Sequence, residues 1–298
     1  MDLRFFLRLR ENQRGLPFVT DFESFLARAE RLLDRLEHFL PSEIETDWDG
    51  IAFRWARGRG LARVPHPHGI RLENLKGIAS QVDLAEANTR QFVNGHSANN
   101  VLLTGARGTG KSSLVKALLN RYAADGLRLI EVEKKDLTDL PQIVEKIEGR
   151  REKFILFCDD LTFDQEEGGY RELKVVLDGS VSTAPDNVLV YATSNRRHLM
   201  PEFMSENLET KYLGDEIHPG ETVEEKISLS ERFGLWISFH PFEQEGYLEI
   251  VHHWLDHFGV KKKRGAEKAA LQWALNRGSR SGRIAWQFAR DWAGREKG

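Results

Sequence analysis

The sequence is poor in cysteine and has no dominant charge. Its 298 residues include a single cysteine, Cys158, which has no second thiol in the chain with which to form a disulfide. We therefore interpret Cys158 as a small buried hydrophobic residue, and its isolation fits a reducing compartment. Basic and acidic residues nearly balance, with a formal net charge of −3, so the chain has no overall attraction for nucleic acid.

Long apolar runs are also missing. No stretch approaches the roughly 20 residues that a membrane-spanning helix needs. Arginines interrupt the apolar residues of the opening segment MDLRFFLRLRENQRG, which is atypical of a signal peptide. We therefore expect a cytoplasmic protein that does not bind a membrane. Hydrophobic residues make up 40% of the chain and charged residues 30%, which is typical of a folded globular protein.

One glycine-containing stretch has the strongest chemical signal, NNVLLTGARGTGKSSLVKA from Asn99 to Ala117. A short apolar run precedes the glycines and apolar residues at helical spacing follow them, so the order is strand, loop and helix. Gly105, Gly108 and Gly110 have no Cβ and permit positive φ, which lets successive backbone N–H groups point at phosphate oxygens. The following helix adds the positive end of its dipole.

This loop matches the Walker A pattern G-x-x-x-x-G-K-[ST]. The pattern predicts that Lys111 contacts the β- and γ-phosphates of a nucleotide and that the Ser112 hydroxyl binds Mg²⁺. A chance glycine turn is the alternative, and the flanking strand and helix argue against it. The residues expected to contact phosphate are Gly105, Ala106, Arg107, Gly108, Thr109, Gly110, Lys111, Ser112 and Ser113.

Strands and helices then alternate along the chain. Apolar runs at residues 127–132, 154–158, 188–193 and 235–239 predict strands, and residues 140–147 predict a helix. Strands that are apolar throughout and separated by helices are typical of a parallel sheet covered on both faces. We expect the carboxyl ends of these strands to lie at one edge, where ligands bind in open α/β sheets.

Two carboxylates directly follow the apolar run FILFC, a pattern that looks like a Walker B segment. The strand would hold Asp159 beside the phosphate loop, where its carboxylate orders water bound to Mg²⁺. Asp160 would then orient the attacking water. An acidic turn after a buried strand is the alternative interpretation.

The order of these motifs resembles that of the AAA+ ATPases. Walker A lies on the first strand, Walker B on the third, Asn195 at the end of the fourth and Arg232 just before the fifth. More narrowly, the segments RGTGKSSLVKA, FILFCDDL and TSNRRHL together resemble one bacterial group of these ATPases. The resemblance implies an enzyme that hydrolyses ATP to ADP with Mg²⁺ and assembles with copies of itself into a hexameric ring.

The same resemblance implies a domain plan. Residues 71–241 would form an α/β P-loop core with a five-stranded parallel sheet in the order 5-1-4-3-2. Residues 1–70 would be a helical N-terminal region and linker, and residues 242–298 a small helical lid. Within the lid, the sequence itself predicts three helices, at residues 245–258, 266–276 and 281–292.

The resemblance also assigns roles to single residues. Asn195 would lie against the γ-phosphate and the attacking water as sensor 1. Arg232 would be an arginine finger for the nucleotide of the neighbouring subunit, and Arg283 would be sensor 2, reaching the phosphates from the lid. Ile78, in the segment LKGI, would border the adenine. One departure is Asp160, where the family usually has glutamate, and the shorter side chain predicts slow hydrolysis.

The residues alone leave a structural role open for each of these side chains. Asn195 also suits a turn or a cap, and Arg283 suits a solvated position in the first turn of a helix. Arg232 could instead form a surface pair with Glu231 or Glu225. Rival arginines at these positions are Arg196, Arg197 and Arg280.

Three further segments gain nothing from the superfamily pattern. Apolar periodicity from Thr20 to Leu40 predicts an amphipathic helix that packs on the main domain or binds a partner. Residues 48–69 interleave aromatics with arginines. We interpret them as a connector with docked aromatics, and single-stranded nucleic-acid binding is the alternative. The acidic insert between Pro201 and Glu231 is expected to be a solvated loop and helix, or an acidic docking surface.

The leading interpretation is an Mg²⁺-dependent ATPase that moves or remodels a macromolecular client, either protein or nucleic acid. The alternative is an ATP-dependent switch or loader with negligible turnover. A third possibility is a structural adaptor that acts through its N-terminal region. Because residues 133–136 are charged, the sequence gives no sign of an aromatic pore loop that would grip unfolded polypeptide.

Overall fold

The computed structural model describes residues 25–30, 44–161, 169–178, 185–195, 211–213, 216–218, 229–261 and 263–296. The chain divides into two compact units, Met1–Ile44 and Glu45–Gly298. In the first unit, residues 25–30 are helical, and the remainder of the helix predicted from Thr20 to Leu40 lies outside the described residues. Among the described helices, none combines the length and apolar character needed to span a bilayer.

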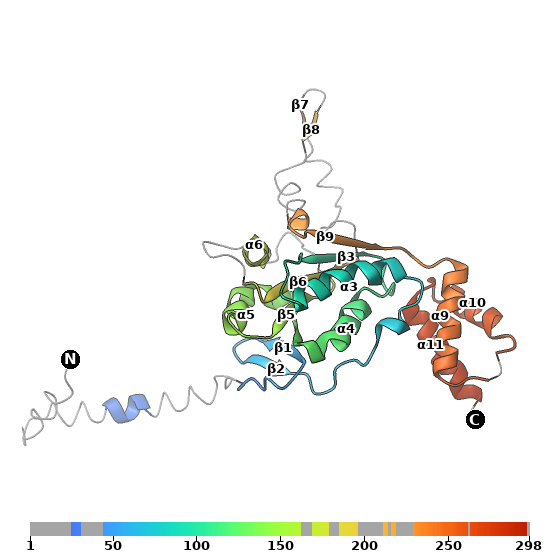
Figure 1. Cartoon of the computed structure of the whole chain (residues 1–298), viewed down its shortest axis with the longest axis horizontal. Helices are drawn as coiled ribbons and strands as arrows, with labels where there is room; N and C mark the ends of the chain where they lie inside the picture. Colours follow the sequence, from blue (N-terminus) through green and yellow to red (C-terminus); the bar gives the residue numbers. More distant parts are fainter. Residues whose placement is uncertain are drawn as a thin grey trace, which may run out of the picture. The chain divides into compact units, whose positions relative to one another are not determined.

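A seven-stranded sheet forms the centre of the second unit (Figure 1). Its spatial order is β2 (Gly60–Arg63), β1 (Ala52–Ala56), β4 (Leu127–Glu131), β5 (Lys153–Cys158), β6 (Val188–Ser194), β3 (Val101–Gly105) and β9 (Leu235–Phe239). All neighbours are parallel except β1 and β2. The five predicted strands occur in the order 5-1-4-3-2, but the prediction of a five-stranded parallel sheet is wrong, since β1 and β2 extend it beyond β4.

The additional strands come from the segment that we expected to be a connector. Phe53 and Trp55 alternate with Arg54, so the two rings face one side of the sheet and are only 1% and 4% exposed. Gly58 and Gly60, with φ of 69° and 97°, make the turn of the antiparallel hairpin. Since both rings lie in the core, they leave no open face on which a nucleic-acid base would stack.

Two arginines of the hairpin bind carboxylates while their side chains stay more than half exposed, at 55% for Arg54 and 58% for Arg57. Arg54 Nη2 lies 2.8 Å from Glu131 Oε2. Arg57 grips Asp139 with two donors, Nη2 to Oδ1 at 3.0 Å and Nε to Oδ2 at 3.1 Å. Trp55 Nε1 donates to the same Asp139 Oδ2 at 2.9 Å. These hydrogen bonds, those from Arg57 first, lower the pKa of the buried Asp139 carboxyl below its ordinary value.

Helices cover both faces of the sheet, as continuously apolar parallel strands require. On one face, α3 (Ala79–Val93) and α4 (Lys111–Tyr122) contribute to a core with Val101 and Leu103 of β3. On the other face, α5 (Leu140–Ile147) and α6 (Tyr170–Asp178) contribute to a core with residues of β3 and β5. The short 3-10 helices η1 (Leu72–Asn74), η2 (Ala123–Asp125) and η3 (Lys134–Asp139) lie in connections between these elements.

Three helices at the C-terminal end have a core of their own. They are α9 (Gln244–His257), α10 (Ala266–Asn276) and α11 (Gly282–Glu296), and they agree with the helices predicted from periodicity to within a few residues. Tyr247 and Phe288 are among the buried residues at their centre. We call these three helices the lid. The predicted domain boundaries after residues 70 and 241 remain predictions.

The described residues of the acidic insert form two short strands and, at residues 229–230, part of a helical turn. Strands β7 (Lys211–Leu213) and β8 (Glu216–His218) pair antiparallel, so the expected loop and helix is wrong for these residues. The insert's other residues up to 228 lie outside the described part of the chain.

The Asp139 cluster provides a test of the hairpin's contribution to stability. We expect Asp139→Asn to lower the free energy of unfolding by about 1–2 kcal/mol, because the amide loses the charge-assisted bonds to Arg57. Urea unfolding at pH 7 measures this. The folded-state pKa of Asp139 is lowered, so its contribution is present above the ordinary pKa and lost as pH falls through the folded-state value. The variant should therefore approach the wild type in strong acid.

The matched control is Asp47→Asn, which removes the carboxylate bound by Arg63 at 2.5 Å. That pair is exposed, so its loss should leave the urea midpoint unchanged. Equal destabilisation by the two variants would contradict the assignment of a structural role to Asp139.

Candidate functional site

The carboxyl ends of three neighbouring strands meet at one edge of the sheet. β6 pairs with β3 on one side and with β5 on the other. The register places Thr104 opposite Ser194 and Cys158 opposite Ala192. The segments that follow these strands are the glycine loop, Asp159–Asp160 and Asn195, and the register brings them together, as expected for parallel strands.

Two loop glycines are required by close packing. A Cβ on Gly105, whose φ is 130°, would lie 2.0 Å from the Phe239 carbonyl oxygen of β9. A Cβ on Gly108, whose φ is 77°, would lie 2.8 Å from Cβ and Oγ of Ser281. The loop backbone therefore runs against the sheet on one side and against the lid on the other. Any side chain at either position would displace it.

Lys111 is buried at the start of α4 and turns into the loop. Its Nζ donates to Gly105 O at 2.6 Å, to Ala106 O at 2.8 Å and to Asn195 Oδ1 at 3.1 Å. An ammonium group has three N–H donors, so these three acceptors satisfy it completely. Burial lowers the pKa of Lys111, an effect that the nearby carboxylate of Asp159 opposes.

The Asp159 carboxylate connects the loop to β6. One oxygen, Oδ1, accepts from Ser112 Oγ at 2.6 Å and from Thr193 Oγ1 at 2.7 Å. Thr193 Oγ1 in turn accepts from the Asp160 backbone N–H at 2.8 Å. Motif analysis missed Thr193, because its only signal is that it is a hydroxyl-bearing residue just before the end of an apolar strand.

Asn195 holds the second carboxylate. Its Nδ2 donates to Asp160 Oδ1, while its Oδ1 accepts from Lys111. A cation on one end and a carboxylate on the other fix the orientation of the amide. Asp160 has a φ of 55°, which places it alone among the described non-glycine residues in the left-handed region. That conformation costs energy for a residue with a Cβ, although aspartate tolerates it better than most.

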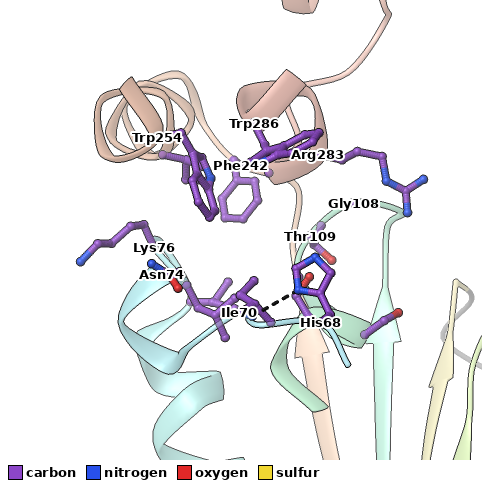
Figure 2. Close-up of a pocket in the computed structure, with 17 residues that line it drawn as sticks. His68, Ile70, Asn74, Lys76, Gly108, Thr109, Phe242, Trp254, Arg283 and Trp286 are labelled. Carbon is purple, nitrogen blue, oxygen red and sulfur yellow. Dashed lines mark hydrogen bonds between the residues drawn. The ribbon is translucent and has the colours of Figure 1, made fainter. Parts of the chain in front are cut away.

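A cavity of about 330 Å³ lies beside the loop (Figure 2). Its polar end is formed by loop residues that include Thr109, Ser112 and Ser113. Its apolar lining consists mainly of Ile70, Leu75, Ile78, Phe242, Ile250, Trp254 and Trp286. Figure 2 shows the rings of Trp254, Phe242 and Trp286 facing this space from the lid side. A flat apolar lining next to the backbone N–H groups of a glycine loop suits a nucleoside base.

The sequence predicted Ile78 in this cavity and missed its aromatic residues. They follow the loop by well over a hundred residues, and their helical spacing is that of ordinary core positions. The lid also contacts the loop directly, since Gly282 N donates to Gly108 O at 2.9 Å. Ser281 Oγ accepts from Ile284 N at 3.3 Å and caps α11. Arg283 lines the cavity, and Figure 2 shows its side chain extending toward Gly108.

Arg232 occupies a different place from the other predicted residues. Its Nε lies 2.5 Å from Asp178 Oδ2 of α6. Glu225, one of the two glutamates considered as a surface partner, lies outside the described residues. Arg196 and Arg197 lie outside the described residues.

Within the part of the chain that the structure describes, no group of three or more His, Cys, Asp or Glu residues could hold a metal ion. The oxygens of Ser112 and Asp159 nevertheless suit Mg²⁺, which usually takes one or two protein ligands together with water and phosphate oxygens.

The contact between the lid and η1 should make stability depend on pH. Asn74 Nδ2 lies 3.3 Å from His253 Nε2, which accepts only when the imidazole is neutral. Burial, and secondarily the charge of Lys76, lower the pKa of His253 below its usual 6.5. Its contribution to stability is therefore present above pH 6.5 and is lost as pH falls through the lowered folded-state pKa. We expect His253→Gln to reduce the loss in thermal midpoint between pH 7.5 and pH 5.

The exposed His96→Gln variant is the matched control, and its midpoint should follow the wild-type curve. A wild-type midpoint that rises on acidification, or an unchanged pH dependence in His253→Gln, would contradict this account of the lid contact.

The sequence matches a known family over most of its length. Residues 49–296 match the family described as "Protein of unknown function (DUF815)". The 26S proteasome regulatory subunit 4 homolog of Saccharomyces cerevisiae is 35% identical over 85 residues, covering 25% of this chain and 20% of that protein. The chain thus spans only a fifth of the length of that relative.

Two solved structures are similar to about three quarters of this chain. The Thermotoga maritima RuvB Holliday junction branch migration motor has a TM-score of 0.52 at 15% identity, covering 74% of this chain and 63% of that chain. The FIGL-1 AAA domain in complex with ADP has a TM-score of 0.51 at 19% identity, covering 76% and 73%. At these identities the similarity shows the fold, which is that of AAA+ proteins.

The resemblance to the AAA+ superfamily is therefore confirmed at the level of the fold. The match to the family covers far more than half of the chain, and this protein belongs to the DUF815 family.

Proposed function

We propose that this protein is a cytoplasmic Mg²⁺-dependent ATPase of the AAA+ class, which binds ATP and ADP between the glycine loop and the lid. One observation carries the proposal. Hydrogen bonds connect the Lys111 ammonium through Asn195 to the Asp160 carboxylate, and the Ser112 hydroxyl to the Asp159 carboxylate. Thr193 joins the two halves, since its hydroxyl donates to Asp159 and accepts from the Asp160 backbone N–H. These are the groups needed to bind a triphosphate and activate water.

The triphosphate oxygens would accept hydrogen bonds from the backbone N–H groups of the loop and from the Lys111 ammonium. Lys111 has carbonyl acceptors at Gly105 and Ala106, and a phosphate oxygen is a stronger acceptor because it is charged. Ser112 and Asp159 would hold Mg²⁺. When bound, the ion neutralises charge on the β- and γ-phosphate oxygens.

Hydrolysis would be a displacement at the γ-phosphorus. A water oxygen bonds to phosphorus as the bond to the bridging oxygen of ADP breaks, and the water proton leaves toward the Asp160 carboxylate or the released phosphate. Asp160 orients the water, and Asn195 holds Asp160 through its Nδ2. Lys111 offsets the negative charge that moves onto the phosphate oxygens. Arg283 would approach the same phosphates from the lid.

The base would lie in the apolar part of the cavity, against Ile78 and the lid aromatics Trp254 and Trp286. A bound nucleotide would then touch both the sheet and the lid. The FIGL-1 AAA domain, which has the same fold, was solved with ADP.

We further propose a homo-oligomeric ring, a hexamer, in which Arg232 acts on the nucleotide of the neighbouring subunit. Arg232 lies at the amino end of β9 and is held by Asp178, away from its own loop, which supports a role in another subunit. The client is a macromolecule, protein or nucleic acid. RuvB is described as a branch migration motor, and the yeast relative is described as a proteasome subunit.

An ATP-dependent switch with negligible turnover is the second candidate, and the short side chain of Asp160 favours it. The aspartate side chain is one methylene shorter than that of glutamate, so its carboxylate lies farther from the attacking water. A water that is held less closely reacts more slowly.

Lys111→Ala should abolish both ATP binding and phosphate release, because the triphosphate loses its principal cation. Asp160→Asn should retain ATP binding within about threefold and lose at least tenfold in the rate of phosphate release. Calorimetric binding and steady-state phosphate release measure the two effects. If the wild type binds ATP but turns it over no faster than Asp160→Asn, the result favours the ATP-dependent switch. If Lys111→Ala binds ATP as tightly as the wild type, the proposed nucleotide site is wrong.

Tryptophan fluorescence tests the position of the base. ADP should change the emission of the wild type, and the change should shrink in Trp254→Phe and in Trp286→Phe. We expect each variant to bind ADP a few-fold to about tenfold more weakly, since a smaller ring contacts the base less. Trp236→Phe is the control, because Trp236 lies 40% exposed on β9 and outside the cavity. An ADP-induced change that survives in both cavity variants and vanishes in the control would place the base elsewhere.

A further inference from the structure

We propose that Arg107 is a positioning residue that fixes the Asp160 carboxylate for the attacking water. The inference rests on the proposed ATPase function and deepens it. Arg107 occupies one of the four variable positions of the Walker A pattern, at which the pattern accepts any residue. The sequence predicted only that its backbone contacts phosphate.

The two oxygens of Asp160 have different donors. Oδ1 accepts from Asn195 Nδ2 at the end of β6. Oδ2 accepts from Arg107 Nη2 at the tip of the loop, at 3.3 Å. The backbone N–H of Asp160 is bound to Thr193 Oγ1 at 2.8 Å. Asp160 is thus held at three points by two segments, the glycine loop and the end of β6.

The second donor, Arg107, restricts rotation of the Asp160 carboxylate. Asn195 alone holds one oxygen and leaves the carboxylate able to turn about its Cβ–Cγ bond, a torsion with a broad energy profile. Arg107 on the other oxygen fixes the plane of the carboxylate. Because the aspartate side chain is short, a small rotation would move its free lone pairs away from a water at the loop, and such misplacement is costly in catalysis.

Arg107 is not a packing residue. Its side chain is 77% exposed and that of Asp160 is 51% exposed. Exposed ion pairs contribute little to folding stability. Variants at Arg107 should therefore fold normally, and any effect on turnover would reflect the position of Asp160.

The competing role for Arg107 is direct contact with a phosphate, which its place in the loop would also permit. The two roles make different demands. A phosphate ligand would contribute to nucleotide affinity and would act whatever residue stands at position 160. A positioning residue acts through Asp160 and has no effect once that carboxylate is removed.

A double-mutant cycle separates these roles. Arg107→Gln, Arg107→Lys, Asp160→Asn and the Arg107→Gln, Asp160→Asn double variant are compared in full-length protein for kcat, KM and the Kd for ATP. We expect Arg107→Gln to lower kcat by about tenfold while KM and Kd stay within about twofold. Arg107→Lys should recover part of kcat, because it keeps one charged donor. The double variant should turn over no more slowly than Asp160→Asn alone.

Arg54→Gln is the matched control. It breaks another arginine–carboxylate pair on the surface, with Glu131 on β4, outside the proposed nucleotide site, and should leave kcat unchanged. Weaker ATP binding by Arg107→Gln, with the same loss in the Asp160→Asn background, would overturn the proposal in favour of a phosphate ligand. An unchanged kcat in Arg107→Gln would overturn the proposal for Arg107 but not the proposed ATPase function. A wild type that neither binds nor hydrolyses ATP would overturn both.

Discussion

The burial of one ammonium group shapes the whole edge of the sheet. Lys111, the first residue of α4, is only 6% exposed, and a buried ammonium group is costly unless its N–H donors find acceptors within the protein. Two acceptors are carbonyls of the loop itself, and the third is Asn195 at the end of β6. The loop is thereby tied to a strand that arrives more than 80 residues later in the sequence. From Asn195 the network continues to Asp160, and from Ser112 to Asp159.

The close approach of backbones imposes a second constraint on the same loop. Gly105 lies against β9 and Gly108 against Ser281, the residue just before α11, leaving no space for a Cβ at either position. The loop thus touches the sheet and the lid at once. If the proposed function is right, a nucleotide bound in the loop would meet groups from both and would couple to the position of the lid. The aromatic residues of the cavity, contributed by α9, α11 and Phe242, add to that route.

Much of this edge could be predicted because its chemistry is local. Two patterns indicate their chemistry from adjacent residues alone: a glycine loop between a strand and a helix, and two aspartates after an apolar strand. Because parallel strands align their carboxyl ends, the two patterns are then expected to lie close together. The β1–β2 hairpin could not be predicted as easily. Its arginines and glycines indicated a connector, whereas the alternation of Phe53 and Trp55 with Arg54 was the signal for a strand. The carboxylates that pair with these arginines come from β4 and η3, and the sequence around the arginines does not predict these pairs.

The same limit explains what was missed in the site. Trp254 and Trp286 have the spacing of core residues in amphipathic helices, and only the fold places them at the cavity. Arg232 pairs with Asp178, on a helix that lies 54 residues earlier in the chain, and the local sequence gave no sign of this contact. Thr193 belongs to no motif and Arg107 fills a variable position of Walker A, so only the structure reveals their contacts with Asp159 and Asp160. Where chemistry depends on residues close in sequence, the pattern sufficed; where it depends on packing across elements, it did not.

The central claim is that a magnesium-bound triphosphate occupies the loop, held by Ser112 and Asp159. Calorimetric titration of ATP into wild type and Ser112→Ala, each with Mg²⁺ and with EDTA, tests it most directly. The account predicts that wild type binds ATP at least about tenfold more tightly with Mg²⁺ than with EDTA and that Ser112→Ala loses most of this difference. Equal affinity with and without the metal, or a Mg²⁺ dependence that Ser112→Ala retains in full, would contradict it.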